Sequence, residues 1–208
     1  MSTSTSTSNT TPASGPDKQK TPSSASDFTP NPSASLRLPP PRQALLDDII
    51  ALYSCQPTVD RIKRYTPDCI YDDPFGYADN RYKIAGQWFA LPKMFSASVN
   101  AGYEVVRSDD EVLQFKSEQK WTFRLLPKTV TLKSLVTLTL EPESVRDGGD
   151  FLRVKYHKDQ NSDKDLSHEG IWFTVKKWQA DNMPGWINMD GVKHFEEDNK
   201  PRQTGEKK

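Results

Sequence analysis

The chain has 208 residues, and its 28 Lys and Arg residues balance its 28 Asp and Glu residues. No basic stripe that could neutralise phosphates is visible and no apolar run approaches the roughly 20 residues of a membrane span, so we expect neither a nucleic-acid nor a membrane partner. Two cysteines are too few for a disulfide framework, and the N-terminus lacks the apolar stretch of a secretory signal. These features predict a cytoplasmic protein, with the nucleus as the alternative.

The first 41 residues are rich in Ser, Thr and Pro, and they hold eight of the 16 prolines. Phe28, Leu36 and Leu38 are almost their only large apolar side chains. Such a segment buries too little apolar surface to offset the entropy lost on ordering. We therefore predict a disordered tail over residues 1–41, one domain over 42–198 and a polar disordered end over 199–208.

Two helices are predicted at the start of this domain. Apolar residues recur at helical spacing from Arg42 to Cys55. A second helix is expected to begin near Pro57, since proline is tolerated in a first turn, and to stop before Pro67. Tyr65 would lie on the buried face of that second helix.

A short extended segment, Ile70–Phe75, is expected to lead into a third helix. Asp79 or Asn80 can cap the start of this helix, because short polar side chains bond to the free backbone amides of a first turn. Pro92 is expected to end or bend it.

After the third helix the apolar period changes from 3.6 to 2, which is typical of strands. Alternation marks residues 113–125, 130–140 and 152–156, and a polar loop over 158–167 precedes a last strand around 171–175. Long antiparallel strands with one dry face, following a group of helices, predict an α+β domain. We expect three N-terminal helices packed on a strongly curved antiparallel sheet of four to six strands.

The order of these elements resembles the nuclear transport factor 2-like superfamily, which includes ketosteroid isomerases, scytalone dehydratases and SnoaL-like polyketide cyclases. The specific part is Tyr65–Gly76, where an aromatic residue and a few polar residues precede an acidic-Pro pair. The match covers about residues 42 to 180 and is closest to uncharacterised fungal proteins described as SigF-like. The resemblance implies a cone-shaped fold that needs no cofactor. It implies no single activity, because the superfamily mixes enzymes with adaptors.

Asp73 is the candidate catalytic residue. In ketosteroid isomerases the acid before this proline is the general base, and partial desolvation would let its carboxylate move a proton on an apolar substrate. Those enzymes also use a first-helix tyrosine and a protonated late-strand acid as donors. An ungapped pairing places Ile49 at the first position, with Tyr53 one turn further on, and the last strand offers no acid. The alternative is that Asp72 and Asp73 only form a turn before the third helix.

Scytalone dehydratase chemistry would instead use two histidines and an acid. His157 and His168 flank the polar loop, but alternation places His157 opposite the apolar residues of its strand. We therefore expect both histidines on the surface. The loop also begins like a calcium loop, yet Lys164 occupies the position that requires glycine, so we predict no metal site.

The aromatic residues indicate a pocket inside the curved sheet. We predict a cavity of several hundred cubic ångströms that holds a small apolar molecule. Its wall is predicted to include Tyr71, Asp73, Trp88, Phe89, Tyr103 and Trp121. Two functions remain open: a pocket protein with isomerase, dehydratase or cyclase chemistry at Asp73, and a non-catalytic module that forms a homodimer or binds a protein through its open sheet face.

Overall fold

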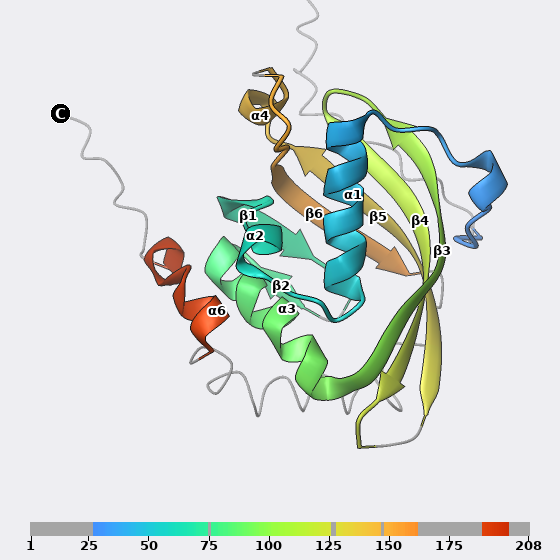
Figure 1. Ribbon diagram of the computed structural model, residues 1–208, viewed down its shortest axis with the longest axis vertical. Helices are drawn as coiled ribbons and strands as arrows, with labels where there is room; N and C mark the ends of the chain where they lie inside the picture. Colours follow the sequence, from blue (N-terminus) through green and yellow to red (C-terminus); the bar gives the residue numbers. More distant parts are fainter. Residues whose placement is uncertain (1–26, 75, 126–127, 147, 162–188, 200–208) are drawn as a thin grey trace, which may run out of the picture.

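The computed structural model describes residues 27–74, 76–125, 128–146, 148–161 and 189–199. Figure 1 shows α1 crossing the concave side of a curled sheet, with α3 beside it. None of the described helices is long and apolar enough to cross a membrane. The elements, in chain order, are η1 (Pro32–Ala34), α1 (Pro40–Tyr53), α2 (Val59–Ile62), β1 (Tyr65–Asp72), β2 (Tyr77–Ala78), α3 (Arg81–Met94), β3 (Phe95–Ser108), β4 (Val112–Phe123), β5 (Thr129–Leu140), α4 (Pro142–Arg146), β6 (Val154–Asn161), α6 (Asp190–Lys193) and η3 (Glu196–Asn199).

The described strands form one six-stranded sheet in the order β2-β1-β6-β5-β4-β3. Neighbouring strands are antiparallel except β1 and β6, which are parallel. The predicted α+β fold with a curved, largely antiparallel sheet is confirmed. The sequence did not predict the parallel pair of β1 and β6. Side chains alternate with a period of two in parallel and in antiparallel strands, so periodicity does not distinguish them.

The core lies between the helices and the concave face of the sheet. Four α1 side chains on the predicted apolar stripe are completely buried, and they pack in one cluster with strand residues such as Phe115 and Val136. Each such side chain contributes roughly 1.5–3 kcal/mol to folding through burial. The four α1 residues are Leu45, Leu46, Ile49 and Leu52.

Residues 27–39, predicted to belong to the disordered tail, instead pack against the sheet (Figure 1). The Asn31 backbone N–H donates to Glu104 Oε2 at 2.8 Å, and the Leu36 N–H donates to the Val105 carbonyl at 3.0 Å. Both acceptors belong to β3, a strand at the edge of the sheet, whose unpaired backbone groups need partners. The domain boundary therefore lies earlier than predicted.

The second helix is shorter than predicted, since α2 spans only Val59–Ile62. Tyr65 is the first residue of β1 and Pro67 lies inside that strand. The pairing of β1 with β6 is irregular between Tyr65 and Ile70. Proline lacks an N–H, and it is tolerated here because it falls where the ladder is interrupted.

The third helix begins as predicted and ends later. The side chain of Asn80 accepts a hydrogen bond from the backbone N–H three residues on, at 2.9 Å, which confirms the cap. The helix continues past Pro92 to Met94, and the Phe95 N–H closes its end on the Leu91 carbonyl. Pro92 therefore removes one helical hydrogen bond without ending the helix.

The histidine prediction is wrong for His157, which is 0% exposed. The pairing of β5 with β6 contains a register shift: Leu140 pairs with Val154, whereas Thr139 pairs with Tyr156. The extra residue is a β-bulge, which reverses the faces of the residues that follow it. The strand also continues to Asn161, so the predicted loop begins later than Lys158.

The segment 189–199 folds as α6 and η3 against α3. The guanidinium of Arg81 in α3 pairs with Asp198 at 2.7 Å and lies 5.0 Å from the centre of the Phe195 ring. Several predicted features lie outside the described residues: the tails over 1–26 and 200–208, His168, Lys164 and the strand around 171–175.

Gly191 tests the contact between α6 and α3. A Cβ added there would lie 2.3 Å from Cζ of Phe89, so Gly191→Ala should lower the free energy of unfolding by about 1–3 kcal/mol. Gly86→Ala is the matched control, because nothing lies within 4 Å of its added Cβ, and this change in α3 should raise stability by about 1 kcal/mol. Urea unfolding measures both, and equal stabilities of Gly191→Ala and the unaltered protein would contradict the packing.

Candidate functional site

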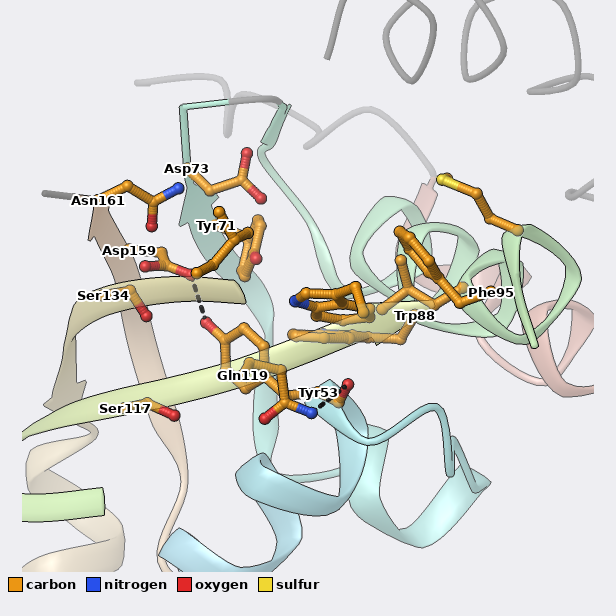
Figure 2. A pocket seen from close by; sticks show the side chains of 14 residues that line it. Tyr53, Tyr71, Asp73, Trp88, Phe95, Ser117, Gln119, Ser134, Asp159 and Asn161 are labelled. Carbon is orange, nitrogen blue, oxygen red and sulfur yellow. Dashed lines mark hydrogen bonds between the residues drawn. The ribbon is translucent and has the colours of Figure 1, made fainter. Parts of the chain in front are cut away.

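A cavity of about 80 Å³ lies between the concave face of the sheet and the helices α1 and α3 (Figure 2). By volume it has room for roughly two or three water molecules, at about 30 Å³ each. It is smaller than predicted, since aromatic side chains fill much of the hollow. Its wall combines apolar side chains (Tyr53, Tyr71, Trp88, Leu91, Met94, Phe95, Trp121 and Leu132) with polar ones (Asp73, Ser117, Gln119, Ser134, Asp159 and Asn161).

The structure brings four of the six predicted lining residues to this wall: Tyr71, Asp73, Trp88 and Trp121. Phe89 follows Trp88 in α3 and faces α6 instead, because successive helical residues point about 100° apart. Tyr103 lies elsewhere on β3, where its hydroxyl accepts a hydrogen bond from Gln43 Nε2 at 3.3 Å. Neither residue belongs to the cavity.

Asp73 follows β1 and holds the turn into β2. Its Oδ1 accepts the Gly76 backbone N–H, and its own N–H donates to the Gly76 carbonyl at 3.1 Å. This is the turn that the alternative interpretation predicted, yet Asp73 also lines the cavity. Asp72 points away, accepting the Tyr156 hydroxyl at 3.0 Å.

Asp159 on β6 is a cavity residue that the sequence did not identify. The Tyr53 hydroxyl donates to its Oδ2 at 2.8 Å (Figure 2). The other oxygen, Oδ1, is shielded from solvent and has no hydrogen-bond partner among the described residues. The residue as a whole is half-buried because it borders the cavity. A carboxyl group with one held and one unpartnered oxygen is therefore available to a ligand.

Desolvation raises the pKa of Asp159 to about 7, and the nearby Asp73 carboxylate adds to the rise. The Tyr53 hydroxyl opposes it by favouring the ionised form, and so does the nearby Ser134 hydroxyl, which is not within hydrogen-bond geometry of Oδ1. Near neutral pH the carboxyl is thus divided between its two protonation states. That is the condition in which a group serves well as a general acid or base.

A buried His157 lies behind this carboxyl. Its Nε2 is 3.1 Å from the Tyr53 hydroxyl, and its Nδ1 is 3.0 Å from the Tyr65 hydroxyl. Burial lowers the pKa of His157 to about 3, so the ring is neutral at physiological pH. Burial also raises the pKa of Tyr53 and of Tyr65 well above the usual value. The group behind Asp159 is therefore uncharged.

Gln119 on β4 anchors Tyr53 from the opposite wall. Its Nε2 donates to Ser98 Oγ at 2.7 Å and to the Tyr53 carbonyl at 3.3 Å, and its Oε1 accepts from Asn100 at 3.1 Å. Ser117 and Gln119 occupy inward positions in the strand alternation that otherwise carry apolar residues. Polar residues at such positions are the sequence signal that could have identified these two members of the wall.

The described residues offer neither a metal site nor a reactive thiol. Among them, no group of three or more His, Cys, Asp and Glu side chains is arranged to hold a metal ion. Both cysteines are free, and burial raises the pKa of Cys55 to about 11 and raises that of Cys69 further. A thiol must ionise to act as a nucleophile, so neither cysteine is a candidate nucleophile near neutral pH.

The fold is that of nuclear transport factor 2-like proteins. An NTF2-like protein from Anabaena variabilis aligns with a TM-score of 0.50 and 11% identity, over 62% of this chain and 91% of that one. A superfamily protein from Salmonella enterica (13% identity; 63% and 97% covered) and a ketosteroid isomerase-like protein from Erwinia carotovora (13%; 59% and 93%) each align with a TM-score of 0.45. No family model and no curated protein matches the sequence. The chain thus has an NTF2-like fold, and the wall of its cavity includes two carboxyl groups, Asp73 and Asp159.

The two perturbed groups have opposite effects on stability. The pKa of Asp159 is higher in the folded protein than its usual 3.8, so the folded state binds the extra proton and this group's contribution is lost as pH rises from about 4 to 7. The pKa of His157 is lower than its usual 6.5, so the unfolded state binds the extra proton and stability rises from about pH 3 to 6.5. Each slope is at most roughly 1.4 kcal/mol per pH unit.

Single substitutions should separate these slopes. Relative to the unaltered protein, the free energy of unfolding of Asp159→Asn should rise by up to roughly 1.4 kcal/mol per pH unit between pH 4 and 7. That of His157→Gln should fall with pH over its own window. Urea unfolding at several pH values measures both, with Asp190→Asn, whose side chain is exposed, as the control. Parallel curves for all variants would contradict the perturbed pKa values.

Proposed function

We propose that this protein binds a small, largely apolar molecule carrying one oxygen function and exchanges a proton with it through Asp159. The observation that carries the proposal is the Asp159 carboxyl, whose Oδ2 is held by Tyr53 while Oδ1 has no partner among the described residues. The rest of the wall is mostly aromatic and aliphatic. Such a pocket favours an apolar body with one polar atom directed at the carboxyl.

The proposed reaction is proton transfer next to a carbonyl group, as in isomerases, dehydratases and cyclases that need no cofactor. Protonated Asp159 would donate to the carbonyl oxygen while the Asp73 carboxylate accepts a proton from the adjacent carbon. The Asp73 proton then returns to another carbon, or passes to a neighbouring hydroxyl group that leaves as water, and the enol oxygen returns its proton to Asp159. Two carboxyl groups in different environments are the usual means of dividing acid from base.

The resemblance to ketosteroid isomerases supports this division of roles. It calls for a first-helix tyrosine and a late-strand acid beside the base. We assign these roles to Tyr53 in α1 and Asp159 on β6, because both line the cavity whereas Ile49 is buried in the core. The cavity, at about 80 Å³, is far too small for a tetracyclic steroid, so the proposed substrate is a compact ketone or a related carbonyl compound.

Acetone in heavy water is a direct probe of this proposal, because the molecule is small enough for a cavity of about 80 Å³. The protein should accelerate exchange of the hydrogens beside the carbonyl, which proton NMR follows as loss of signal. Asp73→Asn and Asp159→Asn should each slow that exchange by roughly 100-fold or more, since general acid–base groups contribute about that much. Asp190→Asn, an exposed control, should exchange like the unaltered protein. Equal rates with and without protein would refute the proposal.

Two further predictions from the sequence remain proposals: the similarity to fungal SigF-like proteins and the cytoplasmic location. Dimerisation through the sheet is not favoured by a specific observation. The outer face carries paired charges, such as Lys116 with Glu104 at 3.2 Å, and Lys133 there bonds to Thr29 of the chain's own N-terminal segment at 2.8 Å. A homodimer would nevertheless be detected by sedimentation at high micromolar concentration.

A further inference from the structure

Four side chains form a hydrogen-bonded row that ends on the cavity wall; we call it the buried chain. Tyr65 contacts His157 Nδ1 at 3.0 Å, His157 Nε2 contacts Tyr53 at 3.1 Å, and Tyr53 donates to Asp159 Oδ2 at 2.8 Å. Its first three members are at most 7% exposed. Water therefore does not compete for these hydrogen bonds, and each partner must be supplied by the protein.

The chemistry of the end group decides the direction of every bond. An ionised carboxylate can only accept, so the Tyr53 hydroxyl must give its single hydrogen to Asp159. The Tyr53 oxygen can then only accept from His157, which requires a hydrogen on Nε2. Because the ring is neutral, Nδ1 has none and must accept from the Tyr65 hydroxyl. All three hydrogens thus point toward Asp159.

We propose that His157 is a positioning residue, which as the Nε2–H tautomer holds the Tyr53 hydroxyl on Asp159 Oδ2 and so leaves Oδ1 as the oxygen that gains and loses the proton at the cavity. The consequence for catalysis rests on the proposed function. The tautomer and the hydrogen-bond direction do not, because they follow from the contacts, the neutral ring and an ionised Asp159.

The surroundings of His157 hold the ring in one orientation. Its ring lies 4.7 Å from that of Tyr71 and 5.9 Å from that of Tyr65, centre to centre, and Trp88 lies on a further side at 6.4 Å. A ring packed among other rings cannot turn to exchange its nitrogens without disturbing them. The geometry that selects the tautomer is therefore maintained by packing as well as by hydrogen bonds.

The described titratable groups around the buried chain are few. Asp73 and Asp159 are the carboxyl groups, and each raises the pKa of Tyr71 beyond the effect of burial. Tyr53 comes from α1, whereas Tyr65 and Tyr71 come from β1. No Lys or Arg belongs to the described cavity wall, so the ionisation of Asp159 is set by burial, by the Asp73 carboxylate and by the hydroxyls of Tyr53 and Ser134.

Nitrogen NMR of the full chain without ligand tests the tautomer directly. The His157 signals, assigned by their loss in His157→Gln, should show a protonated Nε2 and an unprotonated Nδ1 from pH 5 to 8. A hydrogen on Nδ1 at pH 8, where Asp159 is ionised, would overturn the proposal. So would protonation of the ring near pH 6.5, since a charged ring donates at both nitrogens.

A pair of matched variants tests the positioning role. Glutamine places an amide nitrogen near the position of Nε2 and can still donate to Tyr53, whereas asparagine reaches only the position of Nδ1. The pKa of Asp159, followed by carbon NMR of its carboxyl, should rise by about one pH unit in Tyr53→Phe, because a hydrogen bond to the ionised form is lost. His157→Asn should move it in the same direction by at least half as much, and His157→Gln by less than half.

Equal shifts in the asparagine and glutamine variants, or no shift in the asparagine variant, would overturn the positioning role. These measurements need no ligand, so their failure is distinct from that of the proposed function. If acetone does not exchange but the tautomer and shifts are as expected, the proposed function is wrong and His157 still positions Tyr53. If exchange occurs but the tautomer is reversed, only the role of His157 is overturned.

Discussion

The parallel pairing of β1 with β6 is the contact on which the whole site depends. Tyr71 pairs with His157 and Asp72 with Lys158, and this register leads directly from Asp73 to the neighbourhood of Asp159. Two carboxyl groups far apart in sequence thereby influence each other's ionisation. The bulge in β6 completes the arrangement, because without it His157 would face the opposite side of the sheet.

A buried polar group costs free energy unless its hydrogen bonds are satisfied. In this site His157 meets the requirement and Asp159 meets it only in part. Both nitrogens of His157 have hydroxyl partners that hold the ring in place, and burial keeps the ring neutral. Asp159 has a partner for only one of its oxygens. Oδ1 of Asp159 has no partner among the described residues and its residue lines the cavity, so a ligand could supply the missing hydrogen bond. A fully packed core would leave no space for that ligand.

Much of the fold could be predicted from local patterns. The apolar stripe of α1, the Asn80 cap and the alternation of β4 and β5 each arise from neighbouring residues, and all of them appear in the structure. The site could be predicted only in part. Four predicted residues reach the cavity: Tyr71, Asp73, Trp88 and Trp121. Phe89 does not, because it is one helical step from Trp88 and faces α6. Tyr103 does not, because it lies at another position along the long strand β3.

The sequence by itself determined the class of fold and the polar or apolar face of most elements, because periodicity is a local property of the chain. Only the tertiary structure decided the chemistry of the cavity. A bulge placed His157 in the interior, an extended β6 converted Asp159 from a loop residue into a cavity residue, and the end of α1 brought Tyr53 between them. These outcomes depend on contacts between residues about 100 positions apart, and no local pattern records which partner a strand will find.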